Sequence, residues 1–316
     1  MGNVRAREVS LLKVQDLEQM IALKTVETQT AFLREKGFGD IGDTDISDIL
    51  KTETVKLWDY IKSVAPDFDV FKAFIIPNDY HNLKAVFKGT LRERDYSYLL
   101  LKPAEVGEET LKDAINKKSF SALPLYMQKA AEKAYDALIK AGDVQLFDGI
   151  LDASLMETQL NLAAETKIPT LINIINAGVF FDNFKTAIRA ARAKKGADFL
   201  ENCLVDTEFV KKAELKKAAL LGVDEVIALL EKCKAFEGEK AAEAYKKSPT
   251  EFEKFSENFQ MKKALGGKYA VTGADPLIGY LVARLAEIKA VRIIANGTQV
   301  GESEDAIRGM LRELYG

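Results

Sequence analysis

The chain has 316 residues, of which 47% are hydrophobic and 29% charged, and its formal net charge is −3. This composition supplies the apolar core for two or three domains, or for one large domain built of smaller lobes. The near-neutral balance excludes the basic footprint typical of nucleic-acid-binding proteins. Cys203 and Cys233 are too few and too far apart for a metal site or a disulfide framework, and they indicate a reducing compartment.

The start of the chain carries no targeting signal that we can identify. Arg5, Arg7 and Glu8 precede any apolar run, so a signal peptide is not expected. The longest uncharged run, 168–181, is about 14 residues long and is interrupted by Pro169, which makes it too short and too broken to cross a bilayer. We therefore expect no membrane span, and contact with a membrane only through a partner.

Helices are predicted from the beginning of the chain. Between Val4 and Phe38 apolar residues recur at spacings of three and four, which is typical of amphipathic helices. Asp16 and Thr25 can each cap a short helix, and Gly37 can end the second one.

The pattern continues as helix to the end of the chain. Residues 43–64 predict an amphipathic helix that ends before Pro66. Residues 68–88 predict two apolar helices broken at Pro77, with Asp79 capping the second. No segment alternates with period two over more than about five residues, so the predicted fold class is all-α. The remaining helices are expected at 105–115, 124–140, 143–164, 169–195, 276–294 and 304–315, and another opens at Ser248-Pro249.

One segment recurs three times and organises the predicted architecture. Its copies begin at Asn82, Asn183 and Glu287, and each reads polar, large apolar, Lys, then small or apolar. The starts lie 101 and 104 residues apart. A repeat of that length exceeds a solenoid unit of about 20–45 residues and suits three small homologous lobes.

The predicted lobes follow from the turns that flank these copies. A Val-Gly-Glu-type turn that opens an acidic helix start follows each copy, at 106–109, 205–208 and 300–303. Residues 223–230 resemble 14–21, which places the start of the third lobe near residue 210. We therefore predict three lobes related by a pseudo-threefold axis, with boundaries at 1–108, 109–209 and 210–316.

Sequence motifs of the common enzyme classes are missing. His81 is the single histidine, so a two-histidine zinc motif is excluded, and we expect it at the surface or at a helix start. Gly266-Gly267-Lys268 lacks the upstream glycine and the Ser or Thr of a phosphate-binding loop. Carboxylate pairs such as Glu108-Glu109 stand in first turns of helices, where the helix dipole favours them. We predict no catalytic residue, no cofactor and no metal.

Basic residues lie on one face of each recurring segment. The simplest interpretation is a solvated face opposite a core stripe that includes Leu83 and Phe87. The alternative is contact with a partner, for which Lys185, Arg189 and Arg192 of the second copy are the candidate residues. The corresponding residues of the other copies are Lys84 and Lys88, then Arg284, Lys289 and Arg292.

Four stretches carry a resemblance to a known family. They are 5–12, 79–84, 276–289 and 307–315. In their order and spacing these residues resemble the C subunit of bacterial and archaeal rotary V/A-type ATPases, whose eukaryotic counterpart is the d subunit. The resemblance runs from the first predicted helix to the last and covers essentially the whole chain.

The resemblance implies a protein without catalysis. Members of that family form an all-helical funnel of three similar lobes, seated on the membrane ring of ion-carrying subunits at the cytoplasmic face. The funnel receives the central shaft of the soluble ATPase head, so that torque passes from shaft to ring and supports proton or sodium transport. On this basis we expect both shaft and ring as partners, no nucleic acid, and a monomer in isolation.

A second hypothesis is a freestanding helical-repeat adaptor that binds peptide or helix ligands in a groove. Genes for ATPase catalytic and shaft subunits beside this one would favour the first hypothesis over the second.

Overall fold

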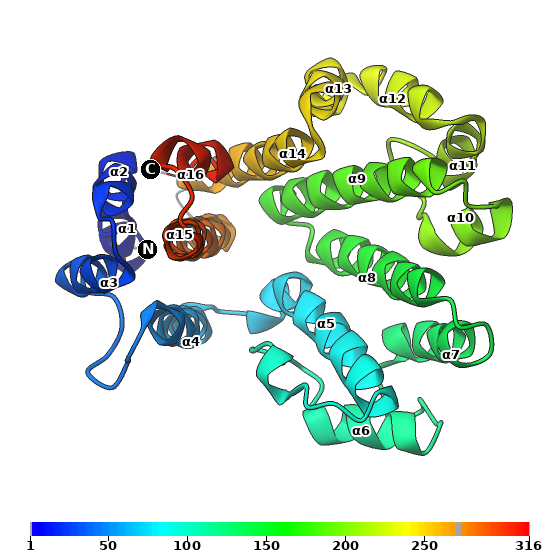
Figure 1. The fold of residues 1–316 in the computed structure, drawn as a ribbon, viewed down its shortest axis with the longest axis horizontal. Coiled ribbons are helices and arrows are strands. Elements are labelled where there is room, and N and C mark those ends of the chain that lie inside the picture. The colour runs from blue at the N-terminus through cyan, green and yellow to red at the C-terminus, as the bar shows by residue number, and fades with distance from the viewer. Residues whose placement is uncertain (1, 270–272, 316) are drawn as a thin grey trace. The chain divides into compact units, whose positions relative to one another are not determined.

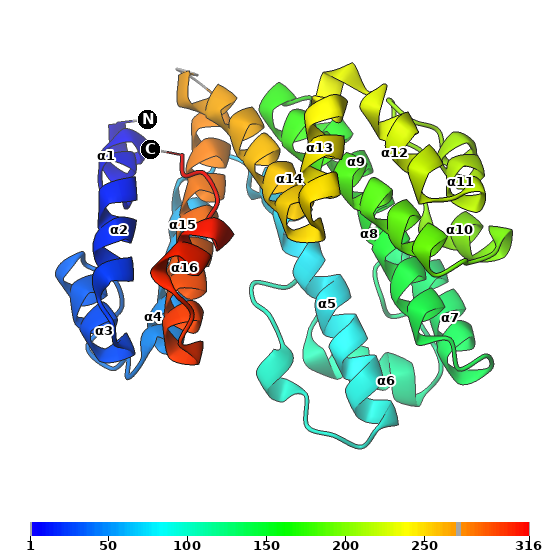
Figure 2. The ribbon, with the colours of Figure 1, turned by 45° about the horizontal axis from the view of Figure 1, so that its top comes forward.

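A computed structural model describes residues 2–269 and 273–315. Every regular element within those ranges is a helix, and no strand occurs in them, as predicted from the spacing of apolar residues (Figures 1 and 2). None of these helices is long and apolar enough to span a membrane.

Internal contacts divide the chain into two compact units. Unit 1 comprises Met1–Phe68, Ile168–Ile174 and Ala244–Gly316, so it contains both ends of the chain. The helices of unit 1 are α1 (Gly2–Val9), α2 (Val14–Ala22), α3 (Val26–Glu35), α4 (Ile46–Val64), α14 (Pro249–Ala264), the 3-10 turn η4 (Leu265–Tyr269), α15 (Asp275–Val300) and α16 (Glu304–Met310). The first and the last of these helices, α1 and α16, both pack against α15 (Figure 1).

Unit 2 comprises Asp69–Lys167 and Ile175–Glu243. Three of the boundaries between the units fall within α9 (Pro169–Arg192), α13 (Gly238–Lys247) and the 3-10 turn η1 (Phe68–Phe71), and the fourth lies between Lys167 and Ile168. The other elements of unit 2 are α5 (Lys72–Leu91), η2 (Ser97–Leu99), α6 (Glu108–Asn116), α7 (Leu125–Ile139), α8 (Val144–Thr166), α10 (Ala197–Cys203), α11 (Lys212–Leu221), α12 (Val223–Glu231) and η3 (Lys234–Phe236).

Several helix starts expected from the sequence are confirmed by their hydrogen bonds. The Thr25 hydroxyl accepts the Thr28 N–H at 3.2 Å at the start of α3, and the Ser248 hydroxyl accepts the Glu251 N–H at 3.0 Å ahead of Pro249 in α14. The helix expected from residue 43 begins three residues later, because Asp45 caps it by accepting the Asp48 N–H.

The predicted break at Pro77 is wrong. Helix α5 runs without interruption through Pro77, which lies inside it. A proline in a helix removes one backbone hydrogen bond, but apolar residues before it, such as Ile75 and Ile76, are buried and hold the helix in place. Asp79 is therefore not a cap; it lies in the helix interior with its side chain fully buried.

Two further expectations need correction. The last helix ends at Met310, because Leu311 is extended and the tail beyond it turns back onto unit 1, where the Arg312 guanidinium pairs with Glu257. The turn expected at 205–208 does not open a helix. There the Thr207 hydroxyl and backbone bond to Val210, and α11 begins only at Lys212.

The core of unit 2 is built where α5 packs against α6, α7 and α8. Its buried residues include Leu83, Val86 and Phe87 of α5, all without exposed surface. The predicted core stripe of the first recurring segment is therefore confirmed. The Phe87 ring lies 5.3 Å from that of Phe147 and 5.9 Å from that of Phe120, centroid to centroid.

Candidate functional site

The three copies of the recurring segment lie on three long helices, α5, α9 and α15. In the first copy the buried Asn82 amide binds the backbone of Leu101 in the loop that follows α5. Its Oδ1 accepts the Leu101 N–H at 2.7 Å, and its Nδ2 donates to the Leu101 carbonyl at 2.9 Å. A single side chain thus satisfies both backbone groups of one loop residue.

The second copy repeats this arrangement. The Asn183 Oδ1 accepts the Val205 N–H at 3.1 Å, and its Nδ2 donates to the Val205 carbonyl at 2.8 Å. Asn183 and Val205 are almost completely buried. Val205 is therefore equivalent to Leu101. The turns at 106–109 and 205–208, predicted to be equivalent, are out of register by five residues, because Val106 lies five positions after Leu101.

In the third copy the same position is Glu287, and its partner comes from the beginning of the chain. The Glu287 Oε1 accepts the Leu12 N–H at 2.5 Å, and both residues are buried. Leu12 precedes α2 as Leu101 precedes α6. Unlike an amide, a carboxylate only accepts hydrogen bonds, so Glu287 leaves the Leu12 carbonyl to other partners. We call these three residues, Asn82, Asn183 and Glu287, the backbone clamps.

Glu287 also belongs to a buried ionic cluster in unit 1. Arg284 forms ion pairs with Glu287 and with Glu53 of α4, and its guanidinium carbon lies 4.3 Å from the centre of the Phe38 ring. Glu53 also accepts the Gly39 N–H at 2.8 Å and pairs with Lys56. The cluster joins α4, α15 and the loop after α3.

Burial and pairing act in opposite directions on these groups. Burial raises the pKa of Glu287, while Arg284 and the Leu12 N–H act to lower it. Burial acts to lower the pKa of Arg284, but Glu287 and Glu53 outweigh it, so the pKa of Arg284 is raised. Arg284 therefore stays charged between the two carboxylates.

Asp79 is a further buried carboxyl, one turn before Asn82 on α5. Its Oδ1 accepts the Val106 N–H at 2.9 Å, whereas its Oδ2 is buried without a hydrogen-bond partner. Burial raises the pKa of Asp79 to about 6; hydrogen bonds from the backbone of Val106 and Glu105 act to lower it, and the Glu105 charge raises it further.

Replacing Asp79 by Asn is expected to change the pH dependence of stability. The folded-state pKa of about 6 lies above the ordinary value of 3.8. Between these pH values the folded state binds more protons than the unfolded state, so the contribution of Asp79 to wild-type stability falls as pH rises. The full free-energy cost of burying the ionised Asp79 carboxylate is present above pH 6. The difference corresponds to about 3 kcal/mol. Urea titrations should show the variant gaining about that much relative to the wild type between about pH 4 and pH 7.5.

A difference between Asp79→Asn and the wild type that stays constant across this pH range would contradict that expectation. The comparison of slopes is informative even if the new amide costs stability, because such a cost does not depend on pH in this range.

The candidate partner-binding residues lie near the C-terminal end of α9. Lys185 is half-buried and pairs with Asp182 at 2.7 Å, one turn before it. Arg189 and Arg192 are exposed, and Arg189 makes no ion pair with any described residue. Both arginines also stand in the last turn, where the helix dipole favours cations.

Most basic residues of the other two copies are already paired within the chain. Lys84 and Lys88 on α5 form ion pairs with Asp152 and Asp148 on α8 at 2.5 and 2.7 Å. Lys289 on α15 pairs with Glu257 on α14 at 2.5 Å, and the Arg284 guanidinium is held in the ionic cluster. These residues connect neighbouring helices, so the three basic faces are not equivalent.

The remaining side chains that could take part in chemistry are those of the single histidine and the two cysteines, and each has a structural environment. His81 is exposed, and one of its ring nitrogens lies 2.9 Å from the Leu99 carbonyl oxygen, in agreement with the surface position expected for it. Burial raises the pKa of Cys203 to about 12 and of Cys233 to about 11. Across the ranges that the structure describes, no three His, Cys, Asp or Glu side chains are grouped so as to hold a metal ion.

The backbone clamps and the ionic cluster were not predicted from the sequence. A signal for the clamps existed, because all three copies begin with a polar residue just before a large apolar one. Neither the clamped residues nor Glu53, 231 positions from Arg284, could be found from sequence spacing.

These features define an all-helical protein built on a recurring long helix, with a buried polar side chain holding the backbone of another segment. The chain belongs to the ATP synthase (C/AC39) subunit family, whose profile matches residues 1–310. The resemblance to the C subunit of V/A-type ATPases is thereby confirmed, and the chain is a non-catalytic accessory subunit.

A curated relative agrees with this assignment. The chain is 23% identical over 216 residues to the C subunit of the V-type sodium ATPase of Enterococcus hirae. The match covers 67% of this chain and 66% of the relative, just under two thirds of the relative's length.

Proposed function

We propose that this protein is the central-stalk element that couples the rotating shaft of a soluble ATPase head to the membrane ring of ion-carrying subunits. In this role it supports proton or sodium transport and is attached peripherally to the cytoplasmic face through its complex. The observation that carries the proposal is the family match over residues 1–310, and the V-type ATPase relative supports it.

The clamps fit a part that must transmit torque. Each recurring helix is fixed by a buried side chain to a segment from which further helices start. Close-packed interiors with satisfied buried polar groups resist deformation, because alternative arrangements leave polar groups unpaired. A coupling element that yielded under load would lose rotation between shaft and ring.

The clamp positions also favour the predicted threefold repeat. Asn82 and Asn183 hold residues 19 and 22 positions further along the chain. Glu287 holds Leu12, so the third copy finds its equivalent segment at the chain's beginning. We propose that three lobes, near 1–108, 109–209 and 210–316, form the funnel of the family. The segment around Leu12, although it lies in the first of these ranges, completes the third lobe by pairing with Glu287.

Reversing the charges of Lys185, Arg189 and Arg192 to Glu is expected to weaken binding to the shaft or the ring. Polar, charged rims suit a contact that must be specific yet reversible. The loss should be larger at low salt than at high salt, because salt already screens part of the attraction. Interferometry of the variant against each purified partner across a salt series measures the effect.

The fold should remain intact, because Arg189 and Arg192 are exposed and the partly exposed Lys185 pairs only with Asp182 one turn away, so these charges contribute little to stability. A matched control reverses the exposed Lys129, Lys133 and Lys217, which changes the net charge of unit 2 equally. Unchanged binding to both partners would mean that the α9 residues form a solvated face, and the family assignment would stand.

A further inference from the structure

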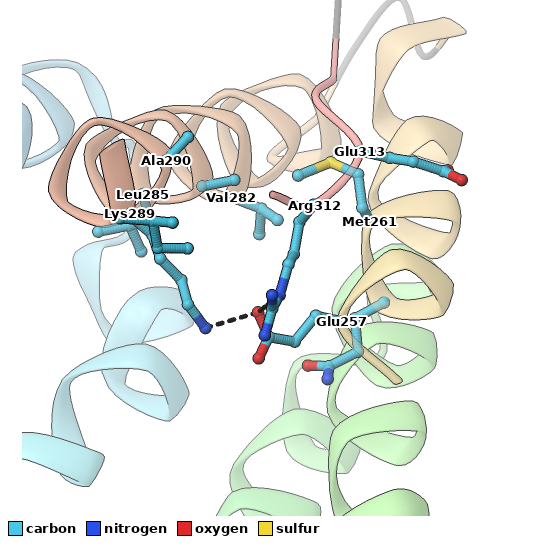
Figure 3. A pocket seen from close by; sticks show the side chains of 11 residues that line it. Glu257, Met261, Val282, Leu285, Lys289, Ala290, Arg312 and Glu313 are labelled. Carbon is cyan, nitrogen blue, oxygen red and sulfur yellow. Dashed lines mark hydrogen bonds and ion pairs between the residues drawn. The ribbon is translucent and has the colours of Figure 1, made fainter. Parts of the chain in front are cut away.

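Two cavities of unit 1 differ in the charges that line them. In the groove along α15, Lys289 and Arg312 both pair with Glu257, and Glu313 lies beside them, so the charges balance (Figure 3). The other cavity has a volume of about 250 Å³ and lies between α1, the end of α3, α4 and α15. Four cations and one carboxylate line it, namely Arg7, Lys36, Lys56, Arg284 and Glu53.

This second cavity has a buried part and an exposed part. Arg284 and Glu53, whose side chains are 12% and 6% exposed, form the buried part. Arg7 and Lys36 are exposed and form the part that solvent reaches. Every residue that lines the cavity belongs to unit 1, so the cavity is complete within that unit.

The charge that faces this cavity is positive, although its cations have partners elsewhere. Glu53 is the single carboxylate in the lining, and both Lys56 and Arg284 pair with it. The other carboxylates bind these cations from outside the lining: Asp16 binds Lys36, Asp40 binds Lys56, and Glu287 binds Arg284. Because the Coulomb energy falls with distance, an anion in the cavity is attracted by the lining cations more than it is repelled by these carboxylates.

The two arginines have N–H donors to spare. Arg7 forms no ion pair with any residue that the structure describes; its guanidinium carbon lies 3.9 Å from the centre of the Tyr60 ring, and it bonds to Tyr280. Stacking uses the face of a guanidinium and leaves the donors on its edge for an acceptor. The bonds from Arg284 to Glu53 and Glu287 likewise leave further donors on that guanidinium.

We propose that this cavity binds a phosphate-type oxyanion, either the free ion or the phosphate end of a small ester, between the guanidinium groups of Arg7 and Arg284. The planar fork of a guanidinium matches two oxygens of a phosphate, and the ammonium groups of Lys36 and Lys56 add charge without fixing its orientation. The cavity volume of about 250 Å³ is below the roughly 300–1,000 Å³ of sites for drug-sized ligands, so it suits a small ion better than a nucleotide. This site does not depend on the proposed coupling role.

A bound ion would hold the first helix to the rest of unit 1. Arg7 belongs to α1, whereas Arg284 belongs to α15, so an ion between them links the two helices. Leu11 also lines the cavity and is next to Leu12, whose N–H is held by Glu287. Occupation of the cavity should therefore reduce local opening of the Glu287 clamp.

Calorimetric titration of the full chain with inorganic phosphate, at an ionic strength held constant with sodium chloride, tests the site. We expect one saturable site with a Kd below about 1 mM. Arg7→Gln and Lys36→Gln change exposed side chains, so the fold should persist, and each should weaken binding at least about tenfold. Lys62→Gln removes the same charge from an exposed position of unit 1 outside the cavity and should leave the Kd unchanged.

A parallel titration with methyl phosphate distinguishes the two sources of the ligand. Equal affinities would support an ester whose phosphate end enters the cavity, and much weaker binding of methyl phosphate would support the free ion. The proposal is overturned if neither compound saturates the protein below about 10 mM, or if Lys62→Gln weakens binding as much as Arg7→Gln does.

Hydrogen exchange at the Leu12 amide locates the bound ion. Phosphate should slow this exchange severalfold in the wild type and leave it unchanged in Arg7→Gln, because only the wild type holds the ion beside the clamp. Saturable binding of phosphate with no change in the exchange of the Leu12 amide would place the ion elsewhere on the chain and overturn the proposal.

Discussion

Replacing Arg284 by Met is expected to destabilise unit 1 by about 3–5 kcal/mol, because it leaves two buried carboxylates without their common cation. Glu53 and Glu287 are 5% and 1% exposed, so water cannot solvate the charges that remain. Their repulsion adds to the loss of the contact between the Arg284 guanidinium and the Phe38 ring. Urea denaturation of the variant at neutral pH measures the change.

The effect should depend on pH in a defined direction. Burial already raises the pKa of Glu287, and removal of Arg284 removes the group that opposes this rise. The folded variant then holds protons that the unfolded chain releases, so its stability falls as pH rises through the carboxyl range. The deficit relative to the wild type should be smaller in mild acid than at neutral pH.

A variant in which these three side chains carry no charge distinguishes the effect of unpaired charge on stability from the effect of lost packing. In the triple variant Arg284→Met/Glu53→Gln/Glu287→Gln no buried charge is left unpaired, and the new amide at position 287 can both accept from and donate to the Leu12 backbone, as Asn82 does at Leu101. We expect it to recover most of the lost stability. A triple variant as unstable as Arg284→Met would mean that lost packing, and not uncompensated charge, causes the effect.

Local features of the fold could be predicted from the sequence because they are set by residues close together. Thr25 and Ser248 cap the helices that follow them, and the side-chain oxygens need only the backbone three positions ahead. The apolar stripe of Leu83, Val86 and Phe87 follows from helical periodicity alone. The all-α class rests on the same periodicity.

The sequence-based predictions that are wrong concern segments whose conformation is decided by tertiary packing. Pro77 is a helix breaker by local rules, yet α5 continues through it because the surrounding residues are buried. The tail beyond Met310 has helical propensity, but it is extended where Arg312 reaches Glu257. In both cases long-range contacts outweigh a local preference of a few kcal/mol.

The candidate site could be predicted only in part for the same reason. The recurring segments lie on the right helices, but the predicted site residues are the basic ones, and the structural role belongs to the polar residue at the start of each copy. Lys84 and Lys88 pair with aspartates on another helix, which no spacing rule reveals. The clamp at Glu287 binds Leu12, 275 positions earlier in the chain, so the partner of the third copy does not follow that copy in sequence as the partners of the first two do.

Replacing Phe87 by Ala is expected to destabilise unit 2 by about 3–5 kcal/mol. The ring has no exposed surface and packs against Phe147 and Phe120. Its removal loses the transfer free energy of a buried aromatic group and leaves a cavity that neighbouring rings from α8 and the 117–124 loop fill only partly. The measurement is the free energy of unfolding from urea titration, with tyrosine fluorescence as the probe.

Leu125→Ala in the same unit is the matched control, because Leu125 is 86% exposed and its truncation should change stability by less than about 0.5 kcal/mol. An unchanged midpoint for Phe87→Ala would mean that the apolar face of α5 is turned towards solvent. The prediction also tests the proposed coupling role, because Phe87 lies on the same helix as Asn82 and its clamped loop. If the protein has that proposed role and α5 transmits load through the clamp, the Phe87→Ala protein should assemble at low temperature. As the complex is warmed, it should then lose coupled ion transport before the proposed ATPase partners lose hydrolysis.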